Sequence, residues 1–573
     1  MRRPFAVFVI SAALACSNSP TSAPIIKLTA PTEGQHVLGG TSFAIQGTAT
    51  GRGASEVTVT LNGGAGPQVP IVSGAFLVTV TLADGDNTVE VTATGVGGKG
   101  SSGLVHFRRA IPPTVQITGP TEGQRFVGSR SITVQGTVAG DGVSAATVKL
   151  NGGAGTQVTL SSGAFTTGVT LADQANTIEV TVQGENGSAS SGVHVLFPYL
   201  ALTTFQNASL VLGQADFTGA AANRSGSVAG DTIKYPYGDA AWDGAHLYLP
   251  DYGNSRVLVY DGFPGTNGAG ASYVLGQPTL TASSGGTTAS WFNGAETVRA
   301  AGGKLFVDDY GNSRVVIFSA IPTTSGAAAD VAVGQPDLTS SGTACTSTRL
   351  NYPESIFVIG TKLIVADSSN NRVMIWNTIP TASGTAADVV LGQKDFTHCV
   401  KNDEAGSGIS GLSPSAKTMF YPTDAWSDGT RLFVADEYNQ RVLVWNTFPT
   451  SNQAAADLVL GQANFTTATA ATTAAGMAYP YFLASNGNQL FVSDNNNSRI
   501  LVWSSLPTTS SVPADVVFGQ ADFTHGTEND DNQNNMVDAS PTARTLNSPS
   551  GVTALDDALI VSDEGNNRYL VYR

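Results

Sequence analysis

A motif with invariant spacing occurs six times in this chain of 573 residues. Each copy holds an Asp, an Arg five residues later and an Asn two residues before that Arg, with an apolar run on either side. Successive copies begin 58, 58, 69, 58 and 69 residues apart. The six copies are Asp251–Arg256, Asp309–Arg314, Asp367–Arg372, Asp436–Arg441, Asp494–Arg499 and Asp563–Arg568. Repeats of this length with several short apolar runs are typical of the blades of a β-propeller.

A second feature, Gly-Gln at the end of an apolar run, also occurs six times, and it indicates how the ring closes. The first copy, Gly213-Gln214, precedes every Asp–Arg motif, whereas the chain ends at Arg573, just after the sixth motif. The sixth repeat therefore lacks its last strand, and Ser209 to Gly213 is surplus. We expect this N-terminal strand to complete the last blade, because closure leaves no unpaired strand edge. The sequence thus predicts a six-bladed β-propeller over residues 205–573.

A Pro opens the first apolar run of five repeats, and Ala295 replaces it in the second repeat. Each lies 14 residues before its motif Asp, except Pro236, which lies 15 residues before. The opening prolines are Pro236, Pro353, Pro422, Pro480 and Pro549. An opening Pro, an apolar strand that ends in Asp, Asn-x-Arg and another apolar strand resemble the NHL family of six-bladed propellers. The resemblance covers residues 205–573 and implies that fold for them.

Two shorter repeats, offset by 89 residues, precede this region. Pro31–Gln35 recurs as Pro120–Gln124, and Leu61–Gly66 recurs as Leu150–Gly155. Short runs of alternating polarity, bounded by Gly, Asn and Asp, predict a β-sandwich in each repeat. The repeats resemble bacterial Ig-like modules, and we place them at residues 25–109 and 112–198. The whole chain is therefore predicted to be all-β, with two Ig-like sandwiches that act as a stalk.

The N-terminus has the pattern of an export signal. Arg2 and Arg3 precede a ten-residue apolar segment that is too short to span a bilayer. Small residues before Cys16 resemble the lipobox of bacterial lipoproteins, although Ala13 stands where Leu is usual. We expect a signal peptide at residues 1–15, lipidation of Cys16 and a flexible tether at residues 16–24. The protein would be exported and held at the bacterial cell envelope by lipid alone, or secreted if an ordinary signal peptidase cleaves it.

Two cysteines remain if Cys16 carries lipid. Cys345 and Cys399 occupy corresponding loops of neighbouring repeats. In an oxidising compartment this placement makes a disulfide possible, and two independent small loop residues are the alternative.

Composition excludes several classes of function. With 28 Lys and Arg against 43 Asp and Glu, the chain has a net charge of −15, which argues against nucleic-acid binding. The six-repeat region has only His246, His398 and His525 as histidines, and no two of them fall in one repeat. No hydrolase, zinc-protease or phosphate-binding motif is present. We therefore predict a protein that is not an enzyme, with a lyase or lactonase propeller as the alternative.

Residues that occur in all six repeats are expected to build the fold. The motif Asp and Arg should pair with each other or with backbone groups, and the Asn should supply a left-handed turn. Better site candidates are positions that differ between repeats near the channel mouth, beginning with the residue after each opening Pro or Ala295. The candidates are Tyr237, Asp239, Glu296, Glu354, Thr423, Asp424, Tyr481 and Ser550, with Trp242 nearby. Acids beside aromatic rings would suit a carbohydrate, a cation or a basic peptide, and a solvated acidic rim is the alternative.

A polar segment near the C-terminus partly matches a calcium-binding loop. Asp530, Asn532, Asn534 and Asp538 fall at positions 1, 3, 5 and 9 of that spacing. Position 12 is Pro541, so the usual bidentate Glu is missing, and a disordered polar loop is the alternative. We predict no other cofactor.

These features favour a binding or adhesion protein of the cell envelope that presents a propeller face to a protein or glycan ligand. A propeller enzyme and a structural envelope scaffold are the alternatives. The patterns identify neither the ligand nor the oligomeric state.

Overall fold

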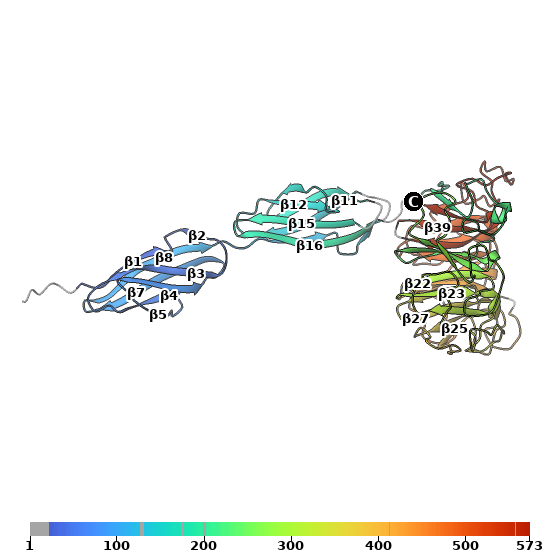
Figure 1. Ribbon diagram of the computed structural model, residues 1–573, viewed down its shortest axis with the longest axis horizontal. Helices are drawn as coiled ribbons and strands as arrows, with labels where there is room; N and C mark the ends of the chain where they lie inside the picture. Colours follow the sequence, from blue (N-terminus) through green and yellow to red (C-terminus); the bar gives the residue numbers. More distant parts are fainter. Residues whose placement is uncertain (1–21, 127–130, 173–175, 199–201, 412, 556) are drawn as a thin grey trace, which may run out of the picture. The chain divides into compact units, whose positions relative to one another are not determined.

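A computed structural model describes residues 22–126, 131–172, 176–198, 202–411, 413–555 and 557–573. Strands dominate and no α-helix occurs in these ranges, which confirms the all-β prediction. None of the short 3-10 helices in these ranges is long and apolar enough to cross a membrane. The predicted signal peptide, Cys16 and the first part of the tether lie outside the described residues. Two compact units meet at Phe197 and Pro198, and each is described by itself (Figure 1).

The N-terminal unit contains two sets of β-sheets, whose strands lie within residues 25–109 and 114–198. In the first domain a three-stranded sheet has the order β1-β3-β6, and a five-stranded sheet has the order β2-β8-β7-β4-β5. The strands of the first domain are β1 (Ile25–Ala30), β2 (Gln35–Val37), β3 (Ser42–Thr50), β4 (Glu56–Leu61), β5 (Gln68–Pro70), β6 (Ala75–Thr81), β7 (Gly85–Gly95) and β8 (Gly98–Arg109).

The second domain repeats this topology, with sheets β14-β11-β9 and β10-β16-β15-β12-β13. Its strands are β9 (Thr114–Gly119), β10 (Arg125–Phe126), β11 (Ser131–Ala139), β12 (Ala145–Leu150), β13 (Thr156–Thr159), β14 (Ala164–Thr170), β15 (Asn176–Gly184) and β16 (Gly187–Pro198).

The alternating polarity of these strands builds one core between the two sheets of each domain. In the first domain Ile45 and Phe76 face Val57 and Val91 in a single buried cluster. A repeated asparagine in each domain ties two turns together: Asn62 donates to the Asn87 Oδ1 at 2.9 Å, and Asn151 donates to the Asn176 Oδ1 at 2.9 Å.

Residues 202–573, which we call the six-sheet domain, form six four-stranded antiparallel sheets. The first three sheets contain β18 (Ala241–Trp242), β19 (His246–Asp251), β20 (Arg256–Asp261), β21 (Tyr273–Leu275); β22 (Ala295–Ala301), β23 (Lys304–Asp309), β24 (Arg314–Phe318), β25 (Val331–Val333); and β26 (Ser355–Ile359), β27 (Lys362–Asp367), β28 (Arg372–Trp376), β29 (Val389–Leu391).

The last three sheets contain β30 (Pro422–Ser427), β31 (Leu432–Asp436), β32 (Arg441–Trp445), β33 (Leu458–Leu460); β34 (Pro480–Ser485), β35 (Leu490–Asp494), β36 (Arg499–Trp503), β37 (Val516–Phe518); and β38 (Pro549–Ala554), β39 (Leu559–Asp563), β40 (Arg568–Tyr572), β17 (Leu210–Leu212). Short 3-10 turns are η1 (Ala222–Ser225), η2 (Tyr252–Asn254), η3 (Tyr310–Asn312), η4 (Ser368–Asn370), η5 (Glu437–Asn439), η6 (Asn495–Asn497) and η7 (Glu564–Asn566).

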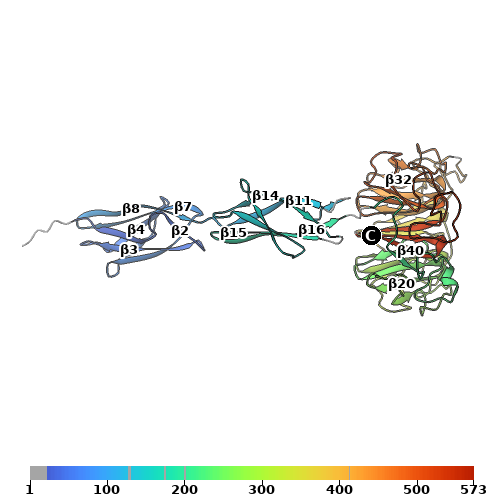
Figure 2. The ribbon, with the colours of Figure 1, turned by 90° about the horizontal axis from the view of Figure 1, so that it is seen from above.

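Consecutive sheets contact each other through their first strands, β22 with β26, β26 with β30, β30 with β34 and β34 with β38. The last sheet also packs against the first, because Leu212 and Val571 share a buried cluster with Leu249. In agreement, the first-sheet strand β20 and the fourth-sheet strand β32 lie on opposite sides of the domain (Figure 2). The order of the sheets is therefore cyclic.

The N-terminal strand pairs with the last sheet, as the surplus strand predicted. β17 pairs antiparallel with β40, with Leu210 opposite Val571 and Leu212 opposite Tyr569. The predicted opening Pro begins the first strand in sheets four to six, and Ala295 does so in sheet two. In sheets one and three the strand begins later, at Ala241 and Ser355.

Candidate binding site at the convergence of the six sheets

The six repeated motifs are structural, as predicted. In every copy the Arg Nε lies 2.7 or 2.8 Å from the Asp Oδ2, and both side chains are fully buried. The guanidinium also donates to backbone carbonyls: Arg441 reaches those of Phe465, Ser415 and Thr418. Each motif therefore fixes two loops to its sheet by charge-assisted hydrogen bonds.

The predicted role of the motif Asn is wrong in one detail. The left-handed residue is the one after it, for example Ser255 with φ of 51° and Gln440 with φ of 56°. The Asn itself lies in the 3-10 turn and donates to the motif carboxylate, as Asn439 does to Asp436 at 2.8 Å. The buried Asp carboxylate needs several N–H donors, which explains why all six copies have an amide side chain at this position.

A pocket of about 250 Å³ lies where the first strands of all six sheets converge. The fourth residue after each opening position, or the fifth after Pro236, lines it, so that each sheet contributes one equivalent residue. These residues are Ala241, Arg299, Phe357, Trp426, Ala484 and Thr553. Trp242, Ser485 and Leu555 come from the ends of the same strands or just beyond. The pocket is therefore a property of the cyclic arrangement and not of one sheet.

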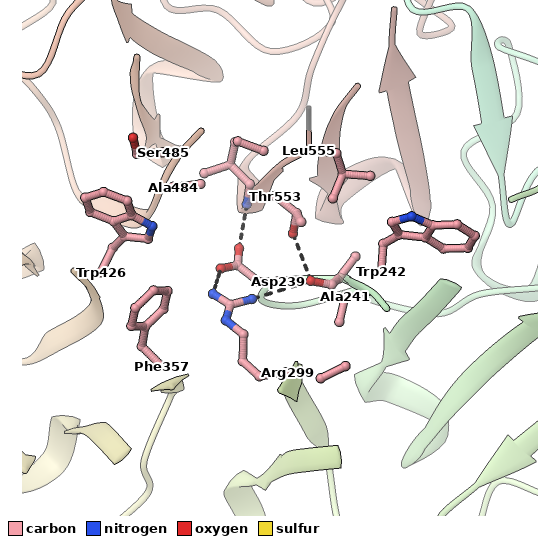
Figure 3. A pocket seen from close by; sticks show the side chains of 14 residues that line it. Asp239, Ala241, Trp242, Arg299, Phe357, Trp426, Ala484, Ser485, Thr553 and Leu555 are labelled. Carbon is pink, nitrogen blue, oxygen red and sulfur yellow. Dashed lines mark hydrogen bonds and ion pairs between the residues drawn. The ribbon is translucent and has the colours of Figure 1, made fainter. Parts of the chain in front are cut away.

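Aromatic side chains line two sides of this pocket. Figure 3 shows Trp426 and Phe357 on one side and Trp242 on the other, with the Asp239–Arg299 pair between them. The Phe357 and Trp426 rings are 6.1 Å apart, and the Arg299 guanidinium lies 5.8 Å from the Phe357 ring. Trp242 packs edge-on against Phe263 at 5.6 Å, which holds its orientation.

The polar part of the pocket is a buried ion pair with unused hydrogen-bonding capacity. Arg299 contacts Asp239, whose other oxygen accepts the Val552 N–H at 2.8 Å. Burial, opposed by Arg299, raises the pKa of Asp239 to about 7. The Arg299 Nε is buried without a hydrogen-bond partner among the described residues. A polar ligand would supply the missing acceptor.

The predicted mouth residues do not form an exposed rim. Asp239, Thr423, Asp424 and Ser550 are fully buried, Glu296 and Glu354 nearly so, and Tyr481 is buried while Tyr237 is half-buried. Bulges near the start of β22, β30, β34 and β38 shift the strand register there. Such shifts re-aim side chains, so alternation along the sequence did not give their direction.

These predicted residues have different surroundings. Thr423 donates to the Tyr481 carbonyl at 2.5 Å and Ser550 to the Pro236 carbonyl at 3.3 Å, so both tie neighbouring first strands together. Only Asp239 lines the pocket, while Asp424 accepts the Leu483 N–H at 2.9 Å. Glu296 and Glu354 lie toward the other end of the first strands. Sequence reasoning missed Arg299, Phe357 and Trp426, although alignment of the repeats on their opening residues would have placed them at one position.

The histidines serve local turns. His398 lies 2.7 Å from Asp395 and His525 lies 2.8 Å from Asp522, each three residues upstream, and His246 contacts Asp243 at 3.1 Å. Across the described ranges, no three His, Cys, Asp or Glu side chains are grouped so that they could hold a metal ion.

The proposed calcium ligands hold their own loop. Asp530 accepts the N–H groups of Asn534 and Asn535 at 3.0 and 2.7 Å. Asp538 accepts the Asp531 N–H at 2.9 Å and an Asn532 amide N–H at 2.8 Å, and the Asn534 side chain accepts the Met536 N–H. The two carboxylates therefore accept N–H donors of their own loop in this structure, and the calcium assignment stays a prediction.

Cys345 and Cys399 form a disulfide, with Cα atoms 6.2 Å apart. It joins the loop before β26 to the loop before β30, and these are the corresponding loops that the repeat alignment indicated.

No protein-family model matches this chain, and no curated protein matches it in sequence. Similar solved structures include fibronectin(III)-like modules of Clostridium thermocellum CbhA, with 15% identity over 31% of this chain and 94% of that chain and a TM-score of 0.17. An I-band fragment of titin has 13% identity over 42% of this chain and 77% of that chain, with a TM-score of 0.26. Titin domains crystallised with telethonin have 16% identity over 32% of this chain and 98% of that chain, with a TM-score of 0.16. Scores this low carry no argument about fold or function.

Proposed function

We propose that this chain is an exported envelope protein in which a six-bladed, NHL-type β-propeller binds a glycan in the pocket lined by Trp242, Phe357 and Trp426. Two Ig-like modules would act as its stalk, and a lipid on Cys16 would be its membrane anchor. Support for the propeller comes from six four-stranded sheets in cyclic order, closed by pairing of β17 with β40.

The observation that carries the binding role is the composition of the pocket. Flat aromatic faces bind the C–H faces of sugar rings, and a few fixed polar groups then select hydroxyl positions. Arg299, Asp239, Thr553 and Ser485 supply such groups beside the three aromatic rings. A binding mouth built by six different strands is rigid, which limits the entropy lost on binding.

The test is a glycan array with the full exported chain, followed by calorimetry on each hit. We expect saturable binding that falls about tenfold in Trp242→Ala and in Phe357→Ala, because each change removes one stacking face. Tyr235→Ala is the matched control, since it removes an exposed aromatic ring from the other end of the first strands. The proposal fails if no glycan binds saturably, or if the control weakens binding as much as the pocket variants do.

Asp239 gives a specific reason to consider a lyase or hydrolase as a second function. A pocket-lining carboxyl with a pKa of about 7 can donate and accept protons at neutral pH. If the protein turns over a bound glycan, Asp239→Asn should abolish turnover even when the glycan is saturating. Unchanged glycan after prolonged incubation with the wild-type protein would exclude this function for that ligand.

A further inference from the structure

The other end of the first strands concentrates tyrosine. Nine of the chain's 15 tyrosines occur at four repeat positions, all within two residues of an opening residue or a motif Asp. The opening residues pair with the motif Asp of the next strand, as Pro422 does with Asp436, so these positions are adjacent. We call the group the tyrosine end; it comprises Tyr235, Tyr237, Tyr252, Tyr310, Tyr352, Tyr421, Tyr438, Tyr479 and Tyr481.

The rings of the tyrosine end form two connected series. Tyr237, Tyr252, Tyr310 and Tyr352 are linked by centroid distances of 5.6, 6.1 and 5.0 Å. Tyr438 lies 5.1 Å from Tyr421, which is stacked on it, and 5.7 Å from Tyr479. Tyr235, Tyr352 and Tyr438 remain 48, 41 and 39% exposed, so aromatic faces are open to a ligand.

The same end of the strands holds a group of carboxylic acids, which we call the acidic cluster: Glu296, Asp308, Glu354, Glu437 and Glu564. Glu296 and Glu354 act electrostatically on both Tyr252 and Tyr310, and Glu437 acts on Tyr438. Glu564 is half-buried, and the other four are 0 to 5% exposed. Glu296 and Glu354 follow an opening residue, and the other three acids adjoin a motif Asp, so the cluster lies at the same end of the strands as the tyrosines.

The acidic cluster has unused acceptors. One oxygen each of Glu296, Glu354 and Glu437 and both oxygens of Asp308 are buried without a hydrogen-bond partner among the described residues. The charged side chains that shift the pKa values of these five groups are all other carboxylates. Buried acids without a cation are costly, so a ligand that brings donors and positive charge would satisfy the cluster.

The chemistry of that ligand follows from the surroundings. Tyrosine faces attract ammonium groups. The same end already shows this contact, with the Lys234 Nζ 5.8 Å from the Tyr235 centroid and the Lys401 Nζ 4.0 Å from that of Phe420. Unpartnered carboxylate oxygens require N–H donors, which a primary ammonium has and a quaternary one lacks.

We propose that the tyrosine end and the acidic cluster form a second binding site, which accepts a primary ammonium group on an unbranched alkyl stem, such as a lysine side chain. The tyrosine faces contact the stem and the charge, and Glu354 and Glu296 accept the N–H donors.

The test is calorimetry at pH 8.5 with the full chain and three probes that share one stem: Nα-acetyl-lysine amide and its Nε-trimethyl and Nε-acetyl derivatives. The lysine amine stays protonated at this pH, since its pKa is about 10.4. We expect the ammonium probe to bind, the trimethyl probe to bind more weakly and the neutral acetyl probe not to bind. Equal or tighter binding of the trimethyl probe, or no binding of the ammonium probe, overturns the proposal.

Variants locate the site. Glu354→Gln should weaken binding of the ammonium probe about tenfold, as expected for one lost charge-assisted hydrogen bond, and Tyr352→Ala should also weaken it. Glu404→Gln is the matched control, because Glu404 is exposed and pairs with Lys417 at 3.7 Å. An equal loss of affinity in the control overturns the proposal, because binding would then depend on the net negative charge of the protein and not on this site. Thermal unfolding confirms that each variant is folded.

The two proposals fail separately. Trp242→Ala should leave binding of the ammonium probe unchanged, and Tyr352→Ala should leave glycan binding unchanged.

Discussion

At the scale of single residues, the six-sheet domain separates two kinds of buried charge. The motif Asp and Arg are fully buried but paired. The motif Asn donates a further hydrogen bond to each carboxylate, as Asn439 does to Asp436. The acidic cluster is also buried, but its members have carboxylates as charged neighbours. Removal of one partner of the first kind should be strongly destabilising, whereas the second kind opposes folding, a cost that the proposed ammonium site would offset.

Loss of one motif arginine should destabilise the domain strongly. Arg441→Ala leaves Asp436 buried without its partner and frees three backbone carbonyls. We expect the free energy of unfolding to fall by about 3–5 kcal/mol in urea titrations. Arg431→Ala is the control: it removes a partly exposed pair with Asp428 and should cost less than about 1 kcal/mol. Similar losses in both variants would contradict a special role of the motif pair.

Glu354 should make stability depend on pH. Burial, opposed by a hydrogen bond from Tyr421 and reinforced by Glu564, raises its pKa to about 8 in the folded chain, whereas an unfolded Glu has a pKa of about 4.3. Between these values only the unfolded chain releases the proton, so stability is full at low pH and falls as pH rises toward 8.

Glu354→Gln removes this contribution. Melting temperatures measured at pH 5 and pH 8 should therefore fall less in the variant than in the wild type, while Glu404→Gln should follow the wild type. Parallel pH profiles for Glu354→Gln and the wild type would show that Glu354 is not buried as an acid.

At the scale of elements, the last sheet combines strands that are distant in sequence. β38, β39 and β40 come from the C-terminal end of the chain, and β17 comes from the start of the six-sheet domain. β17 covers the edge of β40 through Leu210–Leu212, and Leu212 is fully buried. This pairing covers the edge of β40 and links the first strand of the domain to its last sheet.

Removal of β17 should therefore cause association. A chain of residues 214–573 exposes the β40 edge and should self-associate, whereas residues 198–573 should remain monomeric in size-exclusion chromatography with light scattering. If both are monomeric and unfold at the same temperature, the closing strand has no stabilising role.

At the scale of the whole molecule, the six first strands carry a proposed site at each end. The pocket end has Arg299 and three aromatic rings, and the tyrosine end has carboxylates and tyrosines. The pocket pairs Arg299 with Asp239, whereas the charged neighbours of the acidic cluster are carboxylates, so we expect the two ends to bind different ligand classes. A Cys345–Cys399 disulfide suits an oxidising compartment, which agrees with the proposed export.

The proposed lipid anchor has a direct test. Cys16→Ala should shift the protein from the membrane fraction to the soluble exported fraction and abolish labelling by a radioactive fatty acid. Cys345→Ser is the control, since it removes a cysteine far from the signal segment and should leave the labelling intact. Wild-type protein that carries no label would favour the secreted alternative.

The sequence alone determined the features that depend on spacing. Six equal motifs predicted six sheets, because each motif makes the same local ion pair and turn wherever it occurs. The surplus strand before the first motif predicted the pairing of β17 with β40, and corresponding loops suggested the Cys345–Cys399 bond. An offset of 89 residues set the bounds of the two sandwiches.

Tertiary structure alone decided which side chains face which end. Bulges after the opening residues of β22 and β30 shift the register, so that Glu296 and Thr423 are buried while Arg299 and Trp426 line the pocket. Burial also depends on neighbouring sheets that are distant in sequence, as Val552 and Asp239 show by meeting across 313 residues. Local patterns predict pairing within a sheet, but the direction and burial of a side chain are set by the packing of all six.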